Sequence, residues 1–305
     1  MTDVRTEQAY APGVPRALFS AMRPLQWVKN FLIVVAPAAA GTLTHSTVLR
    51  QTAIAFVAFC AISSAVYLLN DVRDREADRR HPKKQFRAIA SGRLSTRTAI
   101  SAALVLLAIG FLLPLAISHP GELLVVLALY VVITLVYIYW IKNVVIVELG
   151  AVASGFFLRA YAGAAASHIP VSTWFLVVIS FGALLLVVGK RLSELKSGGD
   201  VDTRQVLAEY TFKFLESVFT MCATIVVAGY CLWAFDASPT GLSANQDATL
   251  PVRLSVVPVV FAVLFIMRSV EAGDGAAPEE LLVHNRTVQI LVVVWVVLLI
   301  LGVYL

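Results

Sequence analysis

The sequence predicts an all-α protein that crosses a membrane several times, and three observations carry this prediction. Hydrophobic residues make up 59% of the 305 residues, and charged residues make up only 14%. The apolar runs are too long and too numerous for the core of a soluble protein. The charged residues gather between these runs. We therefore expect a polytopic membrane protein made of helices.

The apolar runs give nine candidate spans, each with the roughly 17–24 residues that a helix needs to cross the hydrocarbon core. They fall near 31–47, 51–70, 97–118, 121–141, 144–166, 171–189, 214–234, 253–270 and 287–305. Residues 1–20 form a polar N-terminal arm, and residues 21–305 are expected to form a single transmembrane domain. The segments outside the spans are too short to bury a core of their own.

The positions of Lys and Arg predict the orientation. Of these 24 residues, all but Arg50, Arg159 and Arg253 lie before the first span or in and beside the connections after the second, fourth, sixth and eighth spans. Because cytoplasmic loops carry the excess of Lys and Arg, we expect these connections and the N-terminus in the cytoplasm and the C-terminus outside. The net charge of +5 then reflects topology and phosphorylated ligands, so no nucleic-acid partner is expected.

A ladder of oxygen ligands follows the second span. Asn70, Asp74 and Asp78 recur every four residues, with Asp71 beside them, and side chains at that spacing share one helix face. Mg²⁺ binds such oxygen clusters, usually with substrate phosphates and water completing its shell. The pattern therefore indicates a metal–pyrophosphate site. The alternative is a solvated, charged loop between two spans.

Cations accompany this ladder in three segments. Lys84 and Arg87 follow it along the chain, Lys29 precedes the first span, and Lys190 and Arg191 lie one turn before Glu194 at the end of the sixth span. Lys and Arg can neutralise phosphate oxygens that a metal does not reach. The alternatives are that they follow the positive-inside tendency or anchor the ends of the spans.

Two ionisable residues fall inside the fifth span, Glu148 and Arg159. Such residues are costly in a membrane and tend to face a cavity or one another. Eleven residues separate them, which places them about 16 Å apart along a helix. A direct ion pair is therefore not expected, and we interpret both as polar lining of a central cavity.

Several of these motifs together resemble the UbiA superfamily of intramembrane prenyltransferases. The resemblance rests on Asn70-Asp71-x-x-Asp74-x-x-x-Asp78, on His81-Pro82-Lys83 followed by Arg87 and Ser91-Gly92-Arg93, and on Tyr137-x-x-x-Ile141-Lys142. It implies a bundle of nine helices around a central cavity that opens to the cytoplasm. It also implies a magnesium-dependent transferase, with Mn²⁺ as an alternative ion.

One departure from the family pattern is informative. Typical members carry a second acidic motif after the sixth span, where this chain has Lys190, Arg191 and Glu194. With Arg23-Pro-x-Gln-Trp-x-Lys-Asn and Ala277-Pro-Glu-Glu-x-Leu, this resembles a branch whose donor is phosphoribosyl pyrophosphate. Its acceptor is a polyprenyl phosphate such as decaprenyl phosphate, and its product serves arabinan synthesis in the bacterial cell wall. Such a protein lies in the inner (plasma) membrane, and the resemblance is compatible with a homo-oligomer.

The resemblance implies a role for each candidate residue. Asn70 and Asp74 bind Mg²⁺ on the pyrophosphate, and Asp71 and Asp78 are further ligands or support them. The substrate-binding candidates are Lys29, Tyr67, Lys84, Arg87, Lys142, Arg159, Lys190, Arg191 and Glu194. Two other functions remain open at this stage: prenyl transfer to an aromatic acceptor, and lipid or ion transport without catalysis.

Overall fold

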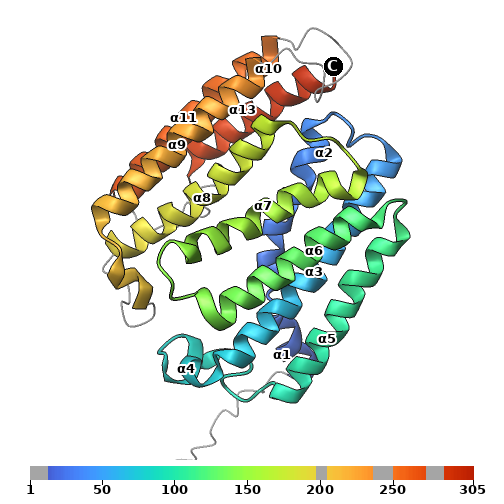
Figure 1. The fold of residues 1–305 in the computed structure, drawn as a ribbon, viewed down its shortest axis with the longest axis vertical. Helices are drawn as coiled ribbons and strands as arrows, with labels where there is room; N and C mark the ends of the chain where they lie inside the picture. Colours follow the sequence, from blue (N-terminus) through green and yellow to red (C-terminus); the bar gives the residue numbers. More distant parts are fainter. Residues whose placement is uncertain (1–12, 197–204, 236–249, 273–284) are drawn as a thin grey trace, which may run out of the picture. The chain divides into compact units, whose positions relative to one another are not determined.

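The computed structural model describes residues 13–196, 205–235, 250–272 and 285–305. Within these ranges the regular structure is helical and includes no strand (Figure 1), so the all-α prediction is confirmed. Eight helices in the described ranges are long and apolar enough to cross a membrane. The acidic segment around Ala277 lies outside the described residues.

The chain divides into two compact units, and the first comprises residues 1–31 and 56–116. It holds α1 (Val14–Ala21), the beginning of η1 (Pro24–Val34), most of α3 (Ser46–Arg73), α4 (Arg75–Arg80), η2 (Lys84–Phe86), α5 (Thr96–Leu112) and η3 (Leu113–Ala116). Small residues make its core: Ala17 of α1, Ala65 of α3, and Ala99 and Ala103 of α5 are buried in one cluster with Leu68. Small side chains allow these helices to approach closely.

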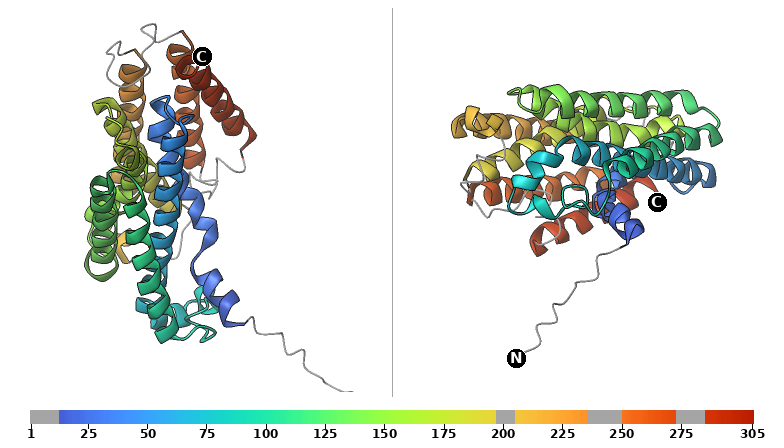
Figure 2. Two further views of the ribbon diagram at one scale, coloured as in Figure 1. Left: turned by 90° about the vertical axis from the view of Figure 1, so that its right-hand side faces the viewer. Right: turned by 90° about the horizontal axis from the view of Figure 1, so that it is seen from below.

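The second unit comprises residues 32–55 and 117–305. It holds α2 (Val35–Ala39), the start of α3, α6 (Pro120–Val136), the π-helical turn η4 (Tyr137–Ile141), α7 (Val147–Ser167), α8 (Thr173–Lys196), η6 (Gln205–Glu209), α9 (Phe212–Phe235), α10 (Leu250–Leu254), α11 (Val256–Ala272) and α13 (Arg286–Val303). Consecutive helices from α6 to α9 pack side by side. Figure 2 shows the same ribbon from two further directions, and α11 packs against both α9 and α13.

Helices α5 and α13 begin where the sequence supplies side-chain caps. Ser95 Oγ accepts a hydrogen bond from the Thr98 N–H at the start of α5, and Asn285 Oδ1 accepts from Thr287 and Val288 at the start of α13. These side chains satisfy N–H groups that have no partner within the helix. Caps of this kind place the ends of the spans more sharply than hydropathy does.

Eight of the nine expected spans correspond to these long helices. The expected span at 31–47 differs, because η1 there gives way to the short α2, which ends at Ala39. Pro24 and Pro37 lack the backbone N–H that a continuous α-helix needs. The count of nine spans and the single domain over 21–305 therefore stay predictions.

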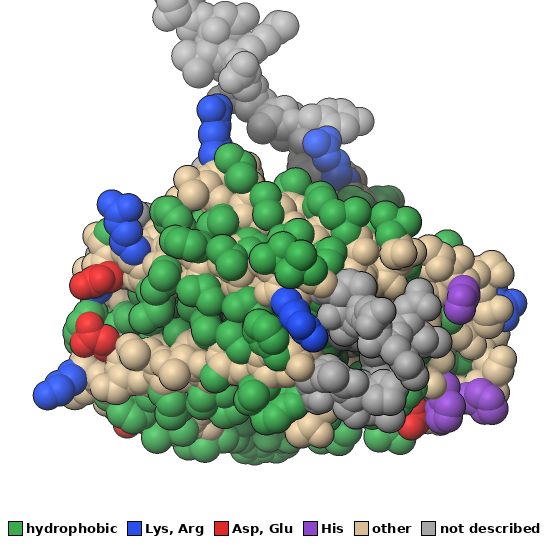
Figure 3. All heavy atoms as spheres, turned by 90° about the horizontal axis from the view of Figure 1, so that it is seen from above, with side chains coloured by type: hydrophobic (Ala, Val, Ile, Leu, Met, Phe, Trp, Pro, Cys, Tyr) green, Lys and Arg blue, Asp and Glu red, His purple; other side chains and the backbone are tan. Residues whose placement is uncertain are grey.

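The surface of the helices suits a lipid environment. In α13 only 11% of the most apolar 18-residue stretch is buried inside the protein, and in the helix Pro120–Ile141 the share is 22%. Many long apolar side chains of these helices are therefore exposed at the protein surface. In Figure 3 hydrophobic side chains cover broad areas of the face that is shown, and charged side chains are scattered. Exposed apolar area of this extent marks contact with a membrane or a partner.

A close approach of backbones joins α7 to the end of η1 within the second unit. A Cβ atom built on Gly163 would lie 1.8 Å from the carbonyl oxygen of Ile33 and 2.9 Å from Cδ of Pro37. No real side chain tolerates the first distance. Gly163 is therefore required by packing.

We predict that Gly163→Ala destabilises the protein, because the added methyl group forces α7 away from Ile33. Overpacking of this kind costs about 1–3 kcal/mol or more. Thermal unfolding of the detergent-solubilised protein measures the effect. Gly150→Ala is the matched control on the same helix, since a Cβ there meets nothing within 4 Å. Equal unfolding temperatures for the two variants would contradict the prediction.

Candidate functional site

The oxygen ladder lies where α3 ends and α4 begins, in the first unit. Asp74 separates the two helices, yet its N–H donates to the Asn70 carbonyl at 2.9 Å and its own carbonyl accepts from the Asp78 N–H at 2.8 Å. These i to i−4 hydrogen bonds continue the helical repeat across the junction. The four-residue spacing of Asn70, Asp74 and Asp78 therefore retains its helical register.

Arginines neutralise two of the ladder's carboxylates. Arg87 Nη1 lies 2.8 Å from Asp78 Oδ2 and 3.3 Å from Asp71 Oδ1, and Arg23 Nη2 lies 2.5 Å from the same Asp71 oxygen. Asp71 and Asp78 are each only 4% exposed. Buried carboxylates of this kind need cationic partners, so these two arginines are part of the structure of the ladder.

Arg23 is absent from the residues that the sequence predicted for the site. Its guanidinium lies 5.0 Å from the centre of the Tyr67 ring as well as against Asp71, so it joins two predicted residues. Its backbone has a positive φ of 55°, which is uncommon for a residue other than glycine. The sequence offered one signal for Arg23, because this residue begins the motif Arg23-Pro-x-Gln-Trp-x-Lys-Asn that precedes the first expected span.

The segment after α4 is held by side-chain hydrogen bonds to its own backbone. His81 Nδ1 accepts from the N–H groups of Lys83 and Lys84, and Arg79 Nε donates to the Ala90 carbonyl at 3.0 Å. Lys84 is half-buried at the start of η2. The ordered backbone thus places the predicted phosphate-binding residues on a defined turn.

The side chains of the ladder do not form a metal site in which the protein supplies all the ligands. Among the described residues there is no group of three or more His, Cys, Asp or Glu side chains that could hold a metal ion, and two of the four ladder side chains are bonded to arginine. Mg²⁺ is commonly bound by one or two carboxylates together with substrate phosphates. The residues present fit that second mode, in which Asn70 and Asp74 would be the protein ligands.

A second group of candidate residues lies in the second unit. Arg191 binds Glu148 with two parallel hydrogen bonds, 2.9 Å from Nε to Oε1 and 2.8 Å from Nη2 to Oε2. Its remaining terminal nitrogen, Nη1, donates to Glu194 Oε2 at 3.0 Å. Glu148 is fully buried and Arg191 is 2% exposed. Arg191 therefore joins the first turn of α7 to the last turns of α8.

The chain that leads into Glu148 has two irregular turns. The first is η4 (Tyr137–Ile141), the π-helical turn that directly follows α6. Ile146 then has a φ of 67° and a ψ of −46°, and Val147 N–H donates to the Val145 carbonyl at 2.8 Å across it. This is a γ-turn of the rare, strained kind. Lys142 lies between the two irregular turns.

Tyr210 supports this strained turn. Its hydroxyl oxygen accepts the Ile146 N–H at 2.7 Å, and its side chain is buried in the core of the second unit. Burial raises the pKa of Tyr210 above its ordinary value of 10, so the hydroxyl stays protonated at neutral pH. No signal in the sequence pointed to Tyr210, because more than sixty residues separate it from Ile146.

Arg159 has partners on its own helix and on α6. Its Nη1 donates to the Gly155 carbonyl at 2.7 Å and its Nη2 to the Tyr130 hydroxyl at 2.8 Å. The guanidinium also lies 4.8 Å from the centre of the Tyr130 ring. Glu148 pairs with Arg191, which agrees with the expectation that Glu148 and Arg159 do not pair directly.

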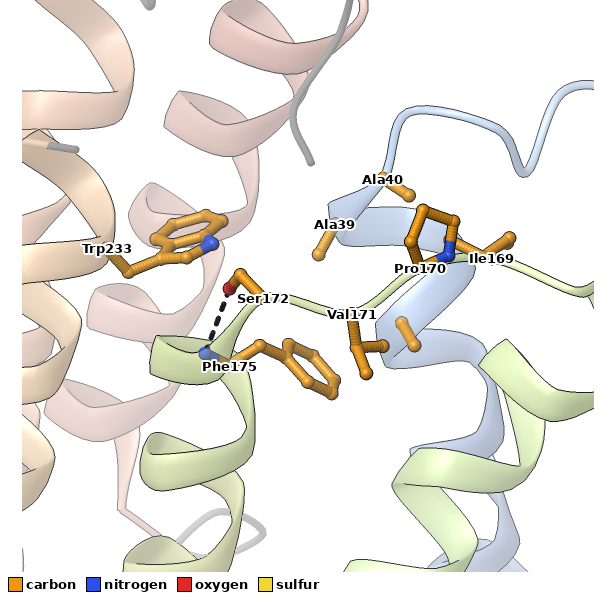
Figure 4. A pocket seen from close by; sticks show the side chains of 9 residues that line it. Ala39, Ala40, Ile169, Pro170, Val171, Ser172, Phe175 and Trp233 are labelled. Carbon is orange, nitrogen blue, oxygen red and sulfur yellow. Dashed lines mark hydrogen bonds between the residues drawn. The ribbon is translucent and has the colours of Figure 1, made fainter. Parts of the chain in front are cut away.

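A small pocket lies at the other end of α7 and α8. It is lined by residues of α2, of the link between α7 and α8, and by Trp233 of α9 (Figure 4). Ser172 Oγ at its edge accepts from the Phe175 N–H. Glu148 and Ser167 stand roughly 30 Å apart along α7, so this pocket is separate from the Glu148–Arg191 ion pair. The predicted central cavity stays a prediction.

The predicted site residues thus fall into two groups. The first unit contains Lys29, Tyr67, Asn70, Asp71, Asp74, Asp78, Lys84 and Arg87. The second unit contains Lys142, Arg159, Lys190, Arg191 and Glu194. Each unit contains a buried carboxylate bonded to arginine: Asp71 in the first unit and Glu148 in the second.

The long apolar helices and their buried ion pairs define an integral, multi-pass membrane protein. The chain belongs to the UbiA prenyltransferase family, whose family model matches residues 31–287.

Individual relatives and a solved structure agree with this assignment. The chain is 39% identical to a decaprenyl-phosphate phosphoribosyltransferase of Corynebacterium glutamicum, over 94% of this chain and 86% of that one. It is also 39% identical to the Mycobacterium tuberculosis protein of the same name, over 90% of each chain. A UbiA homolog from Archaeoglobus fulgidus bound to DMAPP and Mg²⁺ has the same fold, with a TM-score of 0.72, 15% identity, and 94% and 99% of the two chains covered.

We predict that Arg87→Met lowers stability in the absence of any substrate, because it leaves the buried Asp78 carboxylate without this cation. Removing one partner of a buried ion pair costs about 3–5 kcal/mol, and the 30% exposure of the Arg87 side chain reduces our expectation to about 1–3 kcal/mol. Thermal unfolding measures this cost. Arg87→Met combined with Asp78→Asn should recover part of it.

Arg97→Met is the control for this experiment, since Arg97 is exposed in the first turn of α5. The control should unfold at the temperature of the unmodified protein. If Arg87→Met did the same, the carboxylates would not depend on Arg87.

Proposed function

We propose that this membrane protein transfers the 5-phosphoribosyl group of phosphoribosyl pyrophosphate to a polyprenyl phosphate such as decaprenyl phosphate. The observation that carries the proposal is the 39% identity, over nearly the whole chain, to proteins named decaprenyl-phosphate phosphoribosyltransferase. The product would supply arabinan synthesis for the cell wall. The site would face the cytoplasm from the bacterial inner membrane, with the C-terminus outside.

The charges of the candidate residues support this donor. Phosphoribosyl pyrophosphate brings a diphosphate and a 5-phosphate, and the lipid acceptor brings another phosphate. A site for three such groups requires more cations than a site for one prenyl diphosphate. Lys190 and Arg191 stand where typical family members carry an acidic motif, and Arg23 and Arg87 lie against Asp71 of the ladder in the first unit.

The proposed reaction exchanges one bond for another at the anomeric carbon. The bond from C1 of the ribose to the pyrophosphate oxygen breaks, and the pyrophosphate leaves with the electron pair. A bond forms between C1 and an oxygen of the lipid phosphate. This oxygen is already anionic at neutral pH, so the protein needs no strong general base.

Each group of residues has a defined task in this reaction. Asn70 and Asp74 hold the divalent ion, which when bound offsets the charge that develops on the leaving pyrophosphate. Lys29, Lys84 and Arg87 bind phosphate oxygens, and Tyr67 donates a hydrogen bond to the donor. Lys142, Lys190 and Arg159 supply positive charge to the remaining phosphates, and Glu194 accepts hydrogen bonds from ribose hydroxyls. The arrangement stabilises charge rather than moving protons.

We predict that Asp74→Asn lowers the transfer rate by about 100-fold or more, as expected when one group that stabilises the transition state is lost. The assay incubates purified protein in lipid nanodiscs with phosphoribosyl pyrophosphate, decaprenyl phosphate and Mg²⁺. It then follows pyrophosphate release and the ribosylated lipid. Chelation with EDTA should abolish turnover, and added Mg²⁺ should restore it.

Glu76→Gln is the matched control, because Glu76 is an exposed carboxylate two residues further along the chain. It should retain full activity. A protein that instead joined a prenyl pyrophosphate to an aromatic acceptor, and left phosphoribosyl pyrophosphate untouched, would overturn the proposal. Unchanged turnover in a folded Asp74→Asn variant would overturn the role of the ladder. Absence of any group transfer by the folded, unmodified protein would instead favour a transporter.

A further inference from the structure

The proposed function makes little use of one buried ion pair in the second unit, between Glu148 and Arg191. Glu148 is 0% exposed and Arg191 is 2% exposed, and both carboxylate oxygens of Glu148 are engaged by Arg191. An arginine bound in this two-point manner has a fixed plane. Its third nitrogen can therefore point in only one direction.

That third nitrogen binds Glu194. Arg191 Nη1 lies 3.0 Å from Glu194 Oε2, and the Glu194 side chain is 31% exposed while that of Arg191 is 3% exposed. The three residues thus run from a buried carboxylate, through a buried guanidinium, to a carboxylate that reaches the surface. Two of the three nitrogens of Arg191 are occupied by Glu148 and the third by Glu194.

We propose that Glu148 and Arg191 are positioning residues that hold Glu194 as the acceptor for the ribose hydroxyls of the donor. This inference rests on the proposed function, and it assigns Arg191 a task other than binding phosphate. Glu194 becomes the group that distinguishes a sugar diphosphate from a prenyl diphosphate, because only the sugar has hydroxyls to donate. Its pairing with Arg191 also reduces the repulsion between its carboxylate and the phosphates of the donor.

The irregular backbone before Glu148 is consistent with this task. The γ-turn at Ile146 lies two residues before Glu148 and is held by the Tyr210 hydroxyl. Strained backbone persists where the surrounding structure fixes it, and it is found often at binding sites. The turn aims the first residues of α7 so that the Glu148 side chain meets Arg191 inside the protein.

The test compares the binding of two ligands in the presence of Mg²⁺: phosphoribosyl pyrophosphate and inorganic pyrophosphate. Both are measured on the whole protein in detergent by calorimetry or by the shift in unfolding temperature. We expect Glu194→Gln to weaken phosphoribosyl pyrophosphate binding about tenfold or more, the usual range for losing a hydrogen bond to a charged group. Pyrophosphate should not bind more weakly to this variant, since that ligand has no ribose hydroxyl, and its affinity should rise by no more than about twofold.

A loss of affinity for phosphoribosyl pyrophosphate in Glu194→Gln cannot be caused by a change in the electrostatic attraction of its phosphates. Glu194→Gln removes a negative charge, which on electrostatic grounds would raise the affinity for any polyanion. A loss confined to the sugar-containing ligand therefore reports on the hydroxyls. Glu216→Gln is the matched control, because Glu216 is an exposed carboxylate on α9, and it should bind both ligands as the unmodified protein does.

Two further variants test whether Glu148 and Arg191 act through Glu194. Glu148→Gln and Arg191→Lys should each reproduce the selective loss, and Arg191→Lys does so without changing the net charge. Glu148→Gln combined with Glu194→Gln should lose no more than Glu194→Gln alone, because the two residues act in series. Should Glu148→Gln fail to fold, Arg191→Lys and the more exposed Glu194→Gln still decide the question.

Each possible outcome of these binding experiments leads to a definite conclusion. If the unmodified protein binds no phosphoribosyl pyrophosphate, the proposed function fails, and this inference fails with it. If it binds the donor but the three variants bind it normally, or lose both ligands equally, only the inference is overturned. Additive losses in the double variant would show that Glu148 acts independently of Glu194.

Discussion

A carboxylate buried among apolar helices must be paired with a cation, and this constraint organises both units of the protein. In the first unit Arg23 and Arg87 surround Asp71, and Arg87 also binds Asp78. In the second unit Arg191 binds Glu148 through two hydrogen bonds. The cost of leaving either carboxylate unpaired would be several kcal/mol. The arginines are therefore fixed in place before any substrate arrives.

The spans could be predicted from the sequence because hydropathy is a local property. The expected span at 97–118 corresponds to Thr96–Ala116, and that at 121–141 to Pro120–Ile141. The region 31–47 differed because hydropathy does not register how a run of 3₁₀-helix and Pro37 interrupt an α-helix. Length and polarity predict that a segment enters the membrane, but they do not predict its helix type.

Pairings between distant residues could not be predicted in the same way. Glu148 and Arg191 are 43 residues apart, and Arg23 and Asp71 are 48 apart. Each of these charged residues has many potential partners along the chain, and the spacing of distant residues in the sequence does not show which of them lie close in space. The spacing of Asn70, Asp74 and Asp78 was predictable because one helical repeat sets it. Arg87 was predicted to accompany the ladder, but its pairing with Asp71 and Asp78, and that of Arg23 with Asp71, became visible only in the fold.

The arginine pairs also limit which oxygen atoms can serve a metal. A carboxylate oxygen that accepts a short hydrogen bond from a guanidinium has less electron density to offer a cation, and the positive charge beside it repels that cation. Asp71 and Asp78 are in this situation. In the proposed function Asn70 and Asp74 would hold the ion, and most of its coordination shell would come from the phosphates of the substrate. On this argument the ion would bind weakly to the protein alone and firmly once a diphosphate is present, which links metal binding to the arrival of the donor.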